Sequence, residues 1–146
     1  MTDIVIFDLD GTLANIDHRK IHLQHENVLS EHWEKFFKEC PNDTPYLTTI
    51  NILKSVKKYN SSIKIHIWSG RSDLVLNETI EWLAKNDIPY DELKLRSKGD
   101  HKPDYVLKEE WFKDLIDCRV LGVFDDREEV ISMFRKYGIT TYLIKD

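Results

Sequence analysis

Short apolar runs rich in β-branched residues alternate along the chain with longer stretches of helical periodicity. Strands that are buried on both faces appear as continuous apolar runs rather than as alternating ones, and such strands are typical of parallel sheets. The pattern therefore predicts an α/β fold in which helices cover both faces of a parallel sheet. The predicted strands are Asp3–Asp8, Ile63–Trp68, Leu93–Arg96, Val120–Phe124 and Thr140–Ile144.

The segments between the strands predict helices and one loop. Ser30 and Ser72 fit the N-cap position of a helix, and Pro45 fits the first helical position. Residues Ala14–Glu26 are polar and rich in histidine, which is typical of a loop. The predicted helices are Leu29–Lys38, Thr44–Tyr59, a helix from Ser72 to about Asn86, Tyr105–Ile116 and Arg127–Tyr137.

Composition indicates an ordinary soluble protein with a single domain over residues 1–146. The hydrophobic content is 41% and the charged content 32%, and no apolar run is long enough to span a membrane. The N-terminus lacks the pattern of a signal peptide. Cys40 and Cys118 have neither metal-ligand nor redox spacing, so we expect a cytoplasmic protein. A net charge of −5 argues against broad, nonspecific binding of nucleic acid.

Two aspartates follow the first predicted strand. Ligands of open α/β sheets bind beyond the carboxyl ends of the strands, where Asp8 and Asp10 are expected to lie on the same side. Gly11 lets the chain turn away without a side chain that blocks a ligand. Neighbouring carboxylates stay ionised only beside a cation or hydrogen-bond donors, and hard oxygen ligands suit Mg²⁺. The alternative is an ordinary Asp-Gly turn.

A second acidic pair, Asp125 and Asp126, follows the fourth predicted strand. Neighbouring parallel strands place this pair next to Asp8, which predicts one acidic pocket. Asp126 also has a structural interpretation, because with Glu129 it forms an Asp-x-x-Glu capping pattern. Asp125 is therefore the favoured metal ligand of the pair.

Candidate phosphate-binding groups lie between the acidic pairs. Ser69, Gly70 and Arg71 follow the second strand, where a hydroxyl and the backbone N–H groups of a helix start can donate to oxyanions. Asp104 and Lys108 lie four residues apart on a predicted helix, so that the aspartate could fix the lysine; the alternative is an exposed ion pair.

The predicted loop after the first strand offers a further cation and several histidines. Arg19 could extend over the site, although a plain surface charge fits the pattern equally well. The histidines of this region are interpreted as solvated side chains rather than as a metal cluster. They are His18, His22, His25 and His32.

The apolar run followed by Asp8-x-Asp10-Gly-Thr-Leu resembles the nucleophile motif of the haloacid dehalogenase-like (HAD) phosphatases, and Ser69, Lys108 and Asp125-Asp126 follow in the order of that superfamily. The resemblance implies that Asp8 is the nucleophile that forms an aspartyl-phosphate and that Asp10 is the general acid and base. It also implies that Asp8, the Asp10 carbonyl and Asp125 or Asp126 hold Mg²⁺, while Ser69 and Lys108 bind the phosphoryl oxygens.

The segments 99–112 and 124–127 are similar to the 3′-phosphatase domains of bacteriophage polynucleotide kinase–phosphatases. That resemblance implies roles in substrate binding for Arg19, Arg71 and Asp104. No Gly-x-x-x-x-Gly-Lys-Ser/Thr phosphate loop is present, so no kinase half is expected. The segments where a large cap domain would be inserted are short, which predicts an open site with approaches lined by basic residues. These are Arg71, Arg96, Lys98 and Lys102.

The resemblance implies a Rossmann-like HAD fold with strand order 3-2-1-4-5 and no large cap domain. It implies a Mg²⁺-dependent phosphomonoesterase that removes 3′-phosphates from nucleic-acid ends, with a separate kinase or ligase as a possible partner. Three alternatives remain at this point. They are a small-molecule phosphatase such as a nucleotidase, transfer of phosphate to an acceptor other than water, and a noncatalytic nucleic-acid-binding module.

Overall fold

Five parallel strands form the central sheet of the computed structural model, which describes residues 1–145. They are β1 (Thr2–Phe7), β4 (Lys64–Ser72), β5 (Glu92–Arg96), β6 (Cys118–Asp125) and β7 (Thr141–Leu143). Their order across the sheet is β5-β4-β1-β6-β7. Because these five strands follow one another along the chain, the predicted order 3-2-1-4-5 is confirmed. The strand with the two aspartates occupies the centre.

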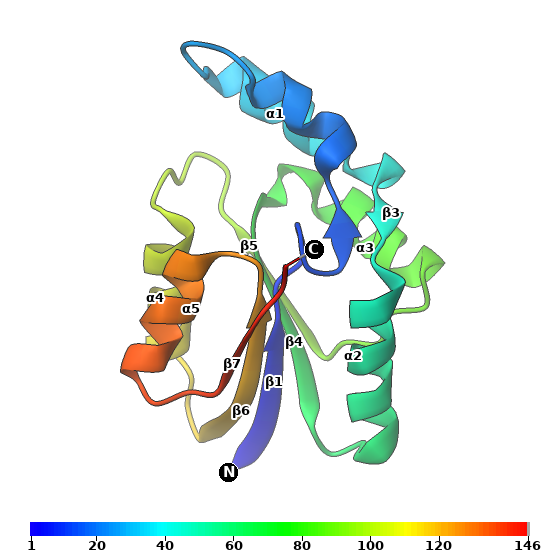
Figure 1. Ribbon diagram of the computed structural model, residues 1–146, viewed down its shortest axis with the longest axis vertical. Helices are drawn as coiled ribbons and strands as arrows, with labels where there is room; N and C mark the ends of the chain where they lie inside the picture. The colour runs from blue at the N-terminus through cyan, green and yellow to red at the C-terminus, as the bar shows by residue number, and fades with distance from the viewer. Residues whose placement is uncertain (146) are drawn as a thin grey trace.

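Helices cover both faces of the sheet (Figure 1). They are α2 (Leu47–Tyr59) and α3 (Leu76–Lys85) on one side, and α4 (Asp104–Lys113) and α5 (Glu128–Lys136) on the other. The continuous apolar run of β1 serves both layers: Val5 and Phe7 belong to one core cluster, and Ile4 and Ile6 to the other. None of the helices within residues 1–145 has the length and apolar character to cross a membrane.

A small insertion, residues 16–42, lies beyond the carboxyl ends of the strands, and we call it the hood (Figure 1). It contains the 3₁₀ helix η1 (Asp17–Leu23), helix α1 (Ser30–Lys38) and the short 3₁₀ helix η2 (Cys40–Asn42). Its two ends are joined by antiparallel pairing of β2 (Ala14–Asn15) with β3 (Thr44–Pro45). The hood is thus anchored at its base directly above the sheet.

Three local predictions in this region were wrong. The predicted loop 14–26 contains β2 and η1. Pro45 lies in β3 rather than at a helix start, because the Tyr46 N–H donates to the Leu13 carbonyl at 2.9 Å and keeps the chain extended as far as α2. The N-cap of α1 is Leu29 rather than Ser30, and the His32 ring accepts from the Leu29 N–H at 2.9 Å.

Strand β4 continues four residues beyond its predicted end at Trp68. Its pairing with β5 is irregular between Ser69 and Ser72, so the segment with the candidate phosphate ligands is extended rather than a helix start. Ser72 does act as a cap, since its hydroxyl accepts from the Leu74 N–H at 3.1 Å, but it caps a short 3₁₀ turn that precedes α3.

Candidate active site

Asp8 and Asp10 lie at the carboxyl end of β1, at the floor of the space under the hood. The Asp8 N–H donates to the Phe124 carbonyl of β6 at 2.9 Å, which fixes the backbone where strand pairing ends. Asp8 is buried, whereas Asp10 is partly exposed. Gly11 has a φ of +83°, and a Cβ at this position would collide with the Asp126 carboxylate. The turn therefore depends on a glycine that admits the second acidic pair.

Asp8 and the second acidic pair form one cluster, as their positions in the sequence predicted, whereas Asp10 lies outside it. Carboxylate oxygens of Asp8, Asp125 and Asp126 lie within 4.8 Å of one another. The Lys108 ammonium, from α4, is buried between them and donates to Asp8 at 2.9 Å and to Asp125 at 2.7 Å. Residues from two strand ends and one helix thus converge on the same small site.

Burial and mutual repulsion shift the pKa values of these carboxyls upward. Burial, together with Asp126, raises the pKa of Asp8 to about 7 in spite of the Lys108 charge. Burial and the nearby Asp8 raise the pKa of Asp125 to about 6. Burial alone would lower the pKa of Lys108, but the two carboxylates outweigh it and raise that pKa. One ammonium therefore does not neutralise three carboxylates, and the site favours a further cation.

The same side chains fit a divalent metal ion. One oxygen of Asp126 is buried and has no hydrogen-bond partner among the described residues, although it lies in a cluster of oxygen ligands. Mg²⁺ is usually held by one or two carboxylates, with water and substrate in the remaining positions. Asp8, Asp125 and Asp126 provide such a set.

Asp10 has the opposite surroundings to those of Asp8. Its carboxylate accepts from Arg71 Nη2 at 2.5 Å and from Arg19 Nη2 at 3.0 Å. Burial favours the neutral acid, but the two guanidinium groups outweigh it and lower the pKa of Asp10. Both arginine side chains are fully buried, so the interpretation of Arg19 as a plain surface charge is wrong. Their predicted direct contact with substrate stays a prediction.

Asp43, which the sequence analysis did not identify, joins the two arginines. Its buried carboxylate accepts from Arg19 Nε and Nη2 at 2.8 and 2.7 Å and from Arg71 Nη2 at 3.1 Å. His18 contacts the same carboxylate at 2.7 Å. The residue follows η2 in an ordinary Pro-Asn-Asp turn sequence, so only the tertiary structure reveals that it faces two buried cations.

Asp104 does not fix Lys108, and the predicted i,i+4 pair is wrong. Lys108 points inward to the acidic cluster, whereas Asp104 accepts from Arg96 Nη2 at 2.6 Å and pairs with Arg127 at 3.3 Å. Arg96 also donates from Nε to the Gly70 carbonyl at 2.8 Å. A Cβ on Gly70 would collide with the Asp104 carboxylate, so this glycine is needed for close approach.

Two further local interpretations change in the structure. The Ser69 hydroxyl is buried in β4 and accepts from the Arg71 N–H at 3.1 Å, so it lies in a strand extension rather than at a helix N-terminus. The capping role predicted for Asp126 with Glu129 is also wrong, because the N-cap of α5 is Arg127 without a side-chain cap. The Arg127 N–H instead donates to Asp125 at 3.0 Å.

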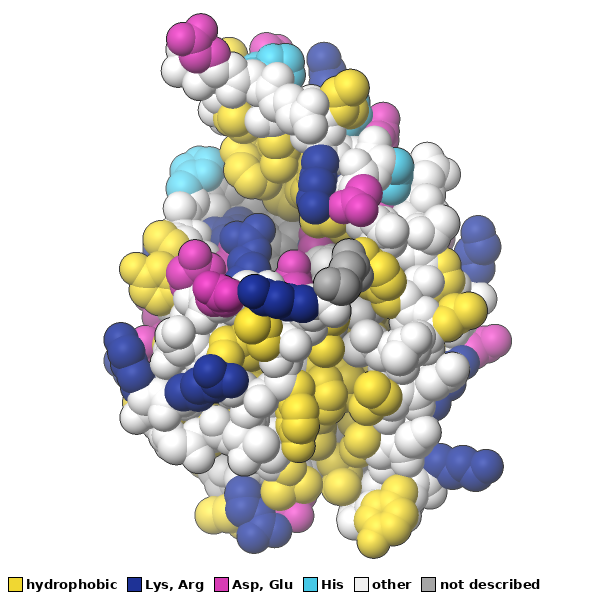
Figure 2. All heavy atoms as spheres, in the orientation of Figure 1, with side chains coloured by type: hydrophobic (Ala, Val, Ile, Leu, Met, Phe, Trp, Pro, Cys, Tyr) yellow, Lys and Arg dark blue, Asp and Glu magenta, His cyan; other side chains and the backbone are white. Residues whose placement is uncertain are grey.

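The site opens into a cleft of about 910 Å³ between the hood and the body of the protein. Figure 2 shows the hollow, with basic and acidic side chains below and apolar side chains on the underside of the hood. The candidate site residues that line it are Asp8, Asp10, Ser69, Gly70, Arg71, Asp104 and Asp126.

Comparisons with known proteins agree with this geometry. The family model for the phosphatase domain of polynucleotide kinase PNKP matches residues 2–146. Two solved structures of the Pnkp1/Rnl/Hen1 complex, one described as an RNA repair complex, contain a chain that is 26% identical, with TM-scores of 0.79 and 0.80. These matches cover 99% of this chain but only 46% and 42% of the other chains.

A more distant match supports the fold alone. The class C acid phosphatase from Bacillus anthracis has 15% identity and a TM-score of 0.68, over 98% of this chain and 66% of that one. The comparison with curated proteins gave no significant match. The chain spans less than half the length of the chains that it matches in the Pnkp1/Rnl/Hen1 structures.

Proposed function

Because the chain belongs to the family of polynucleotide kinase PNKP phosphatase domains, and is a HAD-type phosphatase, we propose that it removes 3′-phosphates from polynucleotide ends with the help of Mg²⁺. The observation that carries the proposal is the convergence of Asp8, Lys108 and the Asp125–Asp126 pair at the floor of an open cleft. This arrangement combines a nucleophile with cations that offset the charge of a phosphoryl group.

The proposed reaction has two steps. In the first, an Asp8 oxygen bonds to phosphorus while the bond from phosphorus to the substrate 3′-oxygen breaks, and Asp10 gives that oxygen a proton. In the second, water attacks the aspartyl-phosphate and gives its proton to Asp10, which releases phosphate and restores Asp8. We assign the binding of phosphoryl oxygens to Lys108 and Ser69. Ser69 lines the cleft, and the Lys108 ammonium donates to Asp8.

Mg²⁺, when bound by Asp8, the Asp10 carbonyl and Asp125 or Asp126, supplies positive charge that offsets repulsion between the nucleophile and the phosphate. The raised pKa values of Asp8 and Asp125 support this assignment, since a cation is what keeps such carboxyls ionised at neutral pH. Asp8 must be ionised to attack.

We assign Arg19 and Arg71 to the orientation of Asp10. Their guanidinium groups hold Asp10 as a carboxylate that is ready to accept a proton. Arg71 lines the cleft, so the oxyanions of a bound phosphate can compete with Asp10 for its guanidinium group. This competition would let Asp10 carry the proton that the first step requires.

The direct test is phosphate release, in the presence of Mg²⁺, from matched 3′-phosphorylated and 5′-phosphorylated oligonucleotides and from nucleoside monophosphates. We expect release from the 3′-phosphorylated oligonucleotide, and we expect Asp8→Asn to abolish it. Faster release from the monophosphates would assign the enzyme to nucleotide substrates instead. Binding of oligonucleotides without any turnover would indicate a noncatalytic module.

The partner is also a proposal. The structures with 26% identity contain Pnkp1 in a complex with Rnl and Hen1, and this chain covers less than half of the chain that it matches there. We propose that a separate kinase or ligase acts on the same polynucleotide ends. In coupled assays on 3′-phosphorylated, 5′-hydroxyl ends, we expect sealing only when this phosphatase, a kinase and a ligase are all present.

A further inference from the structure

We propose that the cleft under the hood binds the terminal nucleobase of a single-stranded polynucleotide, with Trp33 and Phe37 of α1 as the stacking surface. The inference rests on the proposed function and names the part of the substrate that this chain recognises beyond the phosphate. It assigns a binding role to the hood, whose aromatic residues are not explained by the chemistry at Asp8.

The aromatic stripe of α1 has no sheet to pack against. Helix α1 lies beyond the carboxyl ends of the strands and covers neither face of the sheet (Figure 1). Phe36 is buried and its ring lies 4.4 Å from the Arg19 guanidinium carbon, which accounts for that residue. Trp33 and Phe37 line the cleft as well, and Trp33 is 41% exposed. Large aromatic side chains at the wall of a cleft are typical of ligand sites.

The two aromatic rings are already arranged as a platform. Trp33 and Phe37 are stacked, with ring centroids 5.8 Å apart and an interplanar angle of 28°, and Phe36 packs edge-on against Trp33. The rings therefore support each other, which reduces the conformational entropy lost when a base stacks on them.

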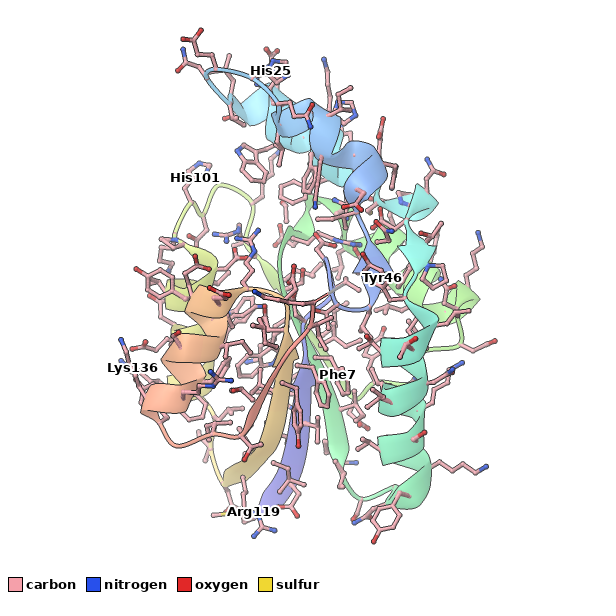
Figure 3. All side chains as sticks on the ribbon, in the orientation of Figure 1. Phe7, His25, Tyr46, His101, Arg119 and Lys136 are labelled. Atoms are coloured by element: carbon pink, nitrogen blue, oxygen red, sulfur yellow. The ribbon has the colours of Figure 1, made fainter. Side chains whose placement is uncertain are left out.

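The opposite wall of the cleft consists of the loop 97–103 and the start of α4. It contributes the His101 ring and the half-exposed ring of Tyr105. Figure 3 shows His101 projecting from this loop on the side that faces the hood. A base that enters the cleft thus meets aromatic side chains on both sides, as in proteins that bind single-stranded nucleic acid.

Charge on the same wall fits the polynucleotide backbone. Lys98 and His101 line the cleft, and neither side chain forms an ion pair or hydrogen bond with any residue between 1 and 145. Lys102 is also on the rim, although it already pairs with Glu110. The unpaired Lys98 ammonium can bind the next phosphate along the strand.

Continuity with the acidic floor fixes which base is bound. The cleft that contains Trp33 and Lys98 also contains Asp8 and Ser69, so a phosphate at Asp8 and a base at Trp33 belong to one ligand. A base that stacks on Trp33 within the cleft has left the base stack of its own strand, which requires that it be unpaired. The ligand is therefore an unpaired 3′-terminal nucleotide.

The test combines a change in the protein with a change in the substrate. Trp33→Ala and the unchanged protein are each assayed on a single-stranded 3′-phosphorylated oligonucleotide and on the same oligonucleotide with an abasic 3′-terminal nucleotide. We expect removal of the base to lower kcat/KM of the unchanged protein on the order of tenfold, and Trp33→Ala to lower it similarly on the base-bearing substrate.

The two changes should not be additive, because each removes the same contact. Trp33→Ala should reduce kcat/KM much less on the abasic substrate, and Trp33→Phe should restore most of the loss. Tyr59→Ala is the matched control, since Tyr59 is a 90% exposed aromatic residue outside the cleft. Its kinetics should match those of the unchanged protein.

Two results would overturn the inference. One is equal processing of base-bearing and abasic ends by the unchanged protein, a comparison that needs no variant to fold. The other is an equal loss on both substrates in Trp33→Ala, which would make Trp33 a packing residue of the hood. Failure of the proposed function is distinct from both, because the unchanged protein would then release no phosphate from the base-bearing 3′-end.

Discussion

Asp8 and Asp10 lie two residues apart in the sequence, yet the fold gives them opposite electrostatic surroundings. Asp8 shares its site with two other carboxylates and one ammonium, whereas Asp10 contacts two guanidinium groups. The pKa of Asp8 is accordingly raised to about 7 and that of Asp10 is lowered. Environments that separate the pKa values of two nearby carboxyls are typical of sites where they have different roles.

The residue-scale prediction that follows concerns stability in the absence of metal. The raised pKa values of Asp8 and Asp125, about 7 and 6 against 3.8 for the free side chain, mean that the folded state binds protons more tightly than the unfolded one. Stability should therefore fall as pH rises from about 4 to 7. Asp10, whose pKa is lowered, is ionised in both states above pH 5 and does not alter this trend.

We therefore expect Asp8 and Asp125 to give the chelator-treated protein a higher thermal midpoint at pH 5.0 than at pH 7.5. Mg²⁺ should raise the midpoint by a few degrees more at pH 7.5, because it binds the ionised carboxylates of the folded state. Calorimetry of the unchanged protein and of Asp125→Asn would check this. The assigned metal site would be contradicted if Mg²⁺ raised the midpoint equally at both pH values. It would also be contradicted if Mg²⁺ raised the midpoint of Asp125→Asn as much as that of the unchanged protein.

Asp43 provides a second residue-scale prediction. Asp43→Asn leaves the buried Arg19 and Arg71 with Asp10 as their remaining carboxylate partner, so the variant should lose about 3–5 kcal/mol of unfolding free energy. The pKa of Asp10 should decrease further, which shifts its limb of the kcat–pH profile to lower pH. Chemical denaturation and a pH series of kcat measure the two effects.

The matched control for Asp43 is Asp91→Asn. Asp91 also forms an ion pair, but with Lys57 at 2.9 Å rather than with an arginine that contacts Asp10. The Asp91→Asn variant should have the same kcat–pH profile as the unchanged protein. If Asp43→Asn keeps the profile of the unchanged protein and loses only stability, Asp43 supports the fold and does not position Asp10.

At the scale of elements, the sequence identified every strand of the main sheet and every helix that covers it, but not where each one stops. Continuous apolar runs reveal buried strands because burial acts on each residue separately. The irregular extension of β4 beyond Trp68 is held by Arg96, which bonds the Gly70 carbonyl from the neighbouring strand. Nothing near Gly70 in the sequence records that contact.

The same limitation explains the site residues. Asp8, Asp125 and Asp126 follow predicted strands, so sheet topology alone brings them together. The predicted pair of Asp104 with Lys108 was wrong. An i,i+4 spacing allows this pair, but it cannot exclude stronger partners in other elements. The acidic cluster was predictable from strand ends, whereas the arginine contacts depend on the folded hood.

Gly70→Ala tests the close approach of β4 to α4. The new methyl group would collide with the Asp104 carboxylate, which Arg96 and Arg127 hold in place. We expect a loss of about 1–3 kcal/mol in unfolding free energy and a higher KM, because the loop that lines the cleft must move. Denaturation and steady-state kinetics measure these effects.

A double-mutant cycle identifies the cause. If the collision is responsible, Asp104→Ala should cost less stability in the Gly70→Ala background than in the unchanged protein. Additive losses would show that the alanine acts on the β4 backbone and not on Asp104.

On the scale of the whole molecule, the protein consists of a well-packed sheet layer and a hood in which few residues are buried. In η1 and α1, Arg19 and Phe36 are the buried residues within the part of the chain that the structure describes. Arg19 joins the hood to the floor, because it packs on Phe36 and donates to Asp10 and Asp43. Any displacement of Arg19 with the hood would therefore remove a hydrogen-bond partner of Asp10.

This architecture predicts a hierarchy of hydrogen exchange. Local opening requires less free energy where few apolar groups are buried, so amides of α1 should exchange faster than those of α2, a helix with three buried residues that packs on the sheet. Amides of β1 should be the slowest, since this strand is central and buried on both faces. Exchange followed by mass spectrometry on peptides from 30–38, 47–59 and 2–7 would measure the order.

A single-stranded 3′-phosphorylated oligonucleotide bound to Asp8→Asn should slow exchange in α1 more than in α2. The reason is that the base contacts α1 of the hood and does not contact α2. A 5′-phosphorylated oligonucleotide is the matched control and should protect α1 less. If α1 is already as protected as β1 in the free protein, the hood is part of the rigid body. Its aromatic surface would then be preformed, and any coupling to Asp10 through Arg19 would act without an opening of the hood.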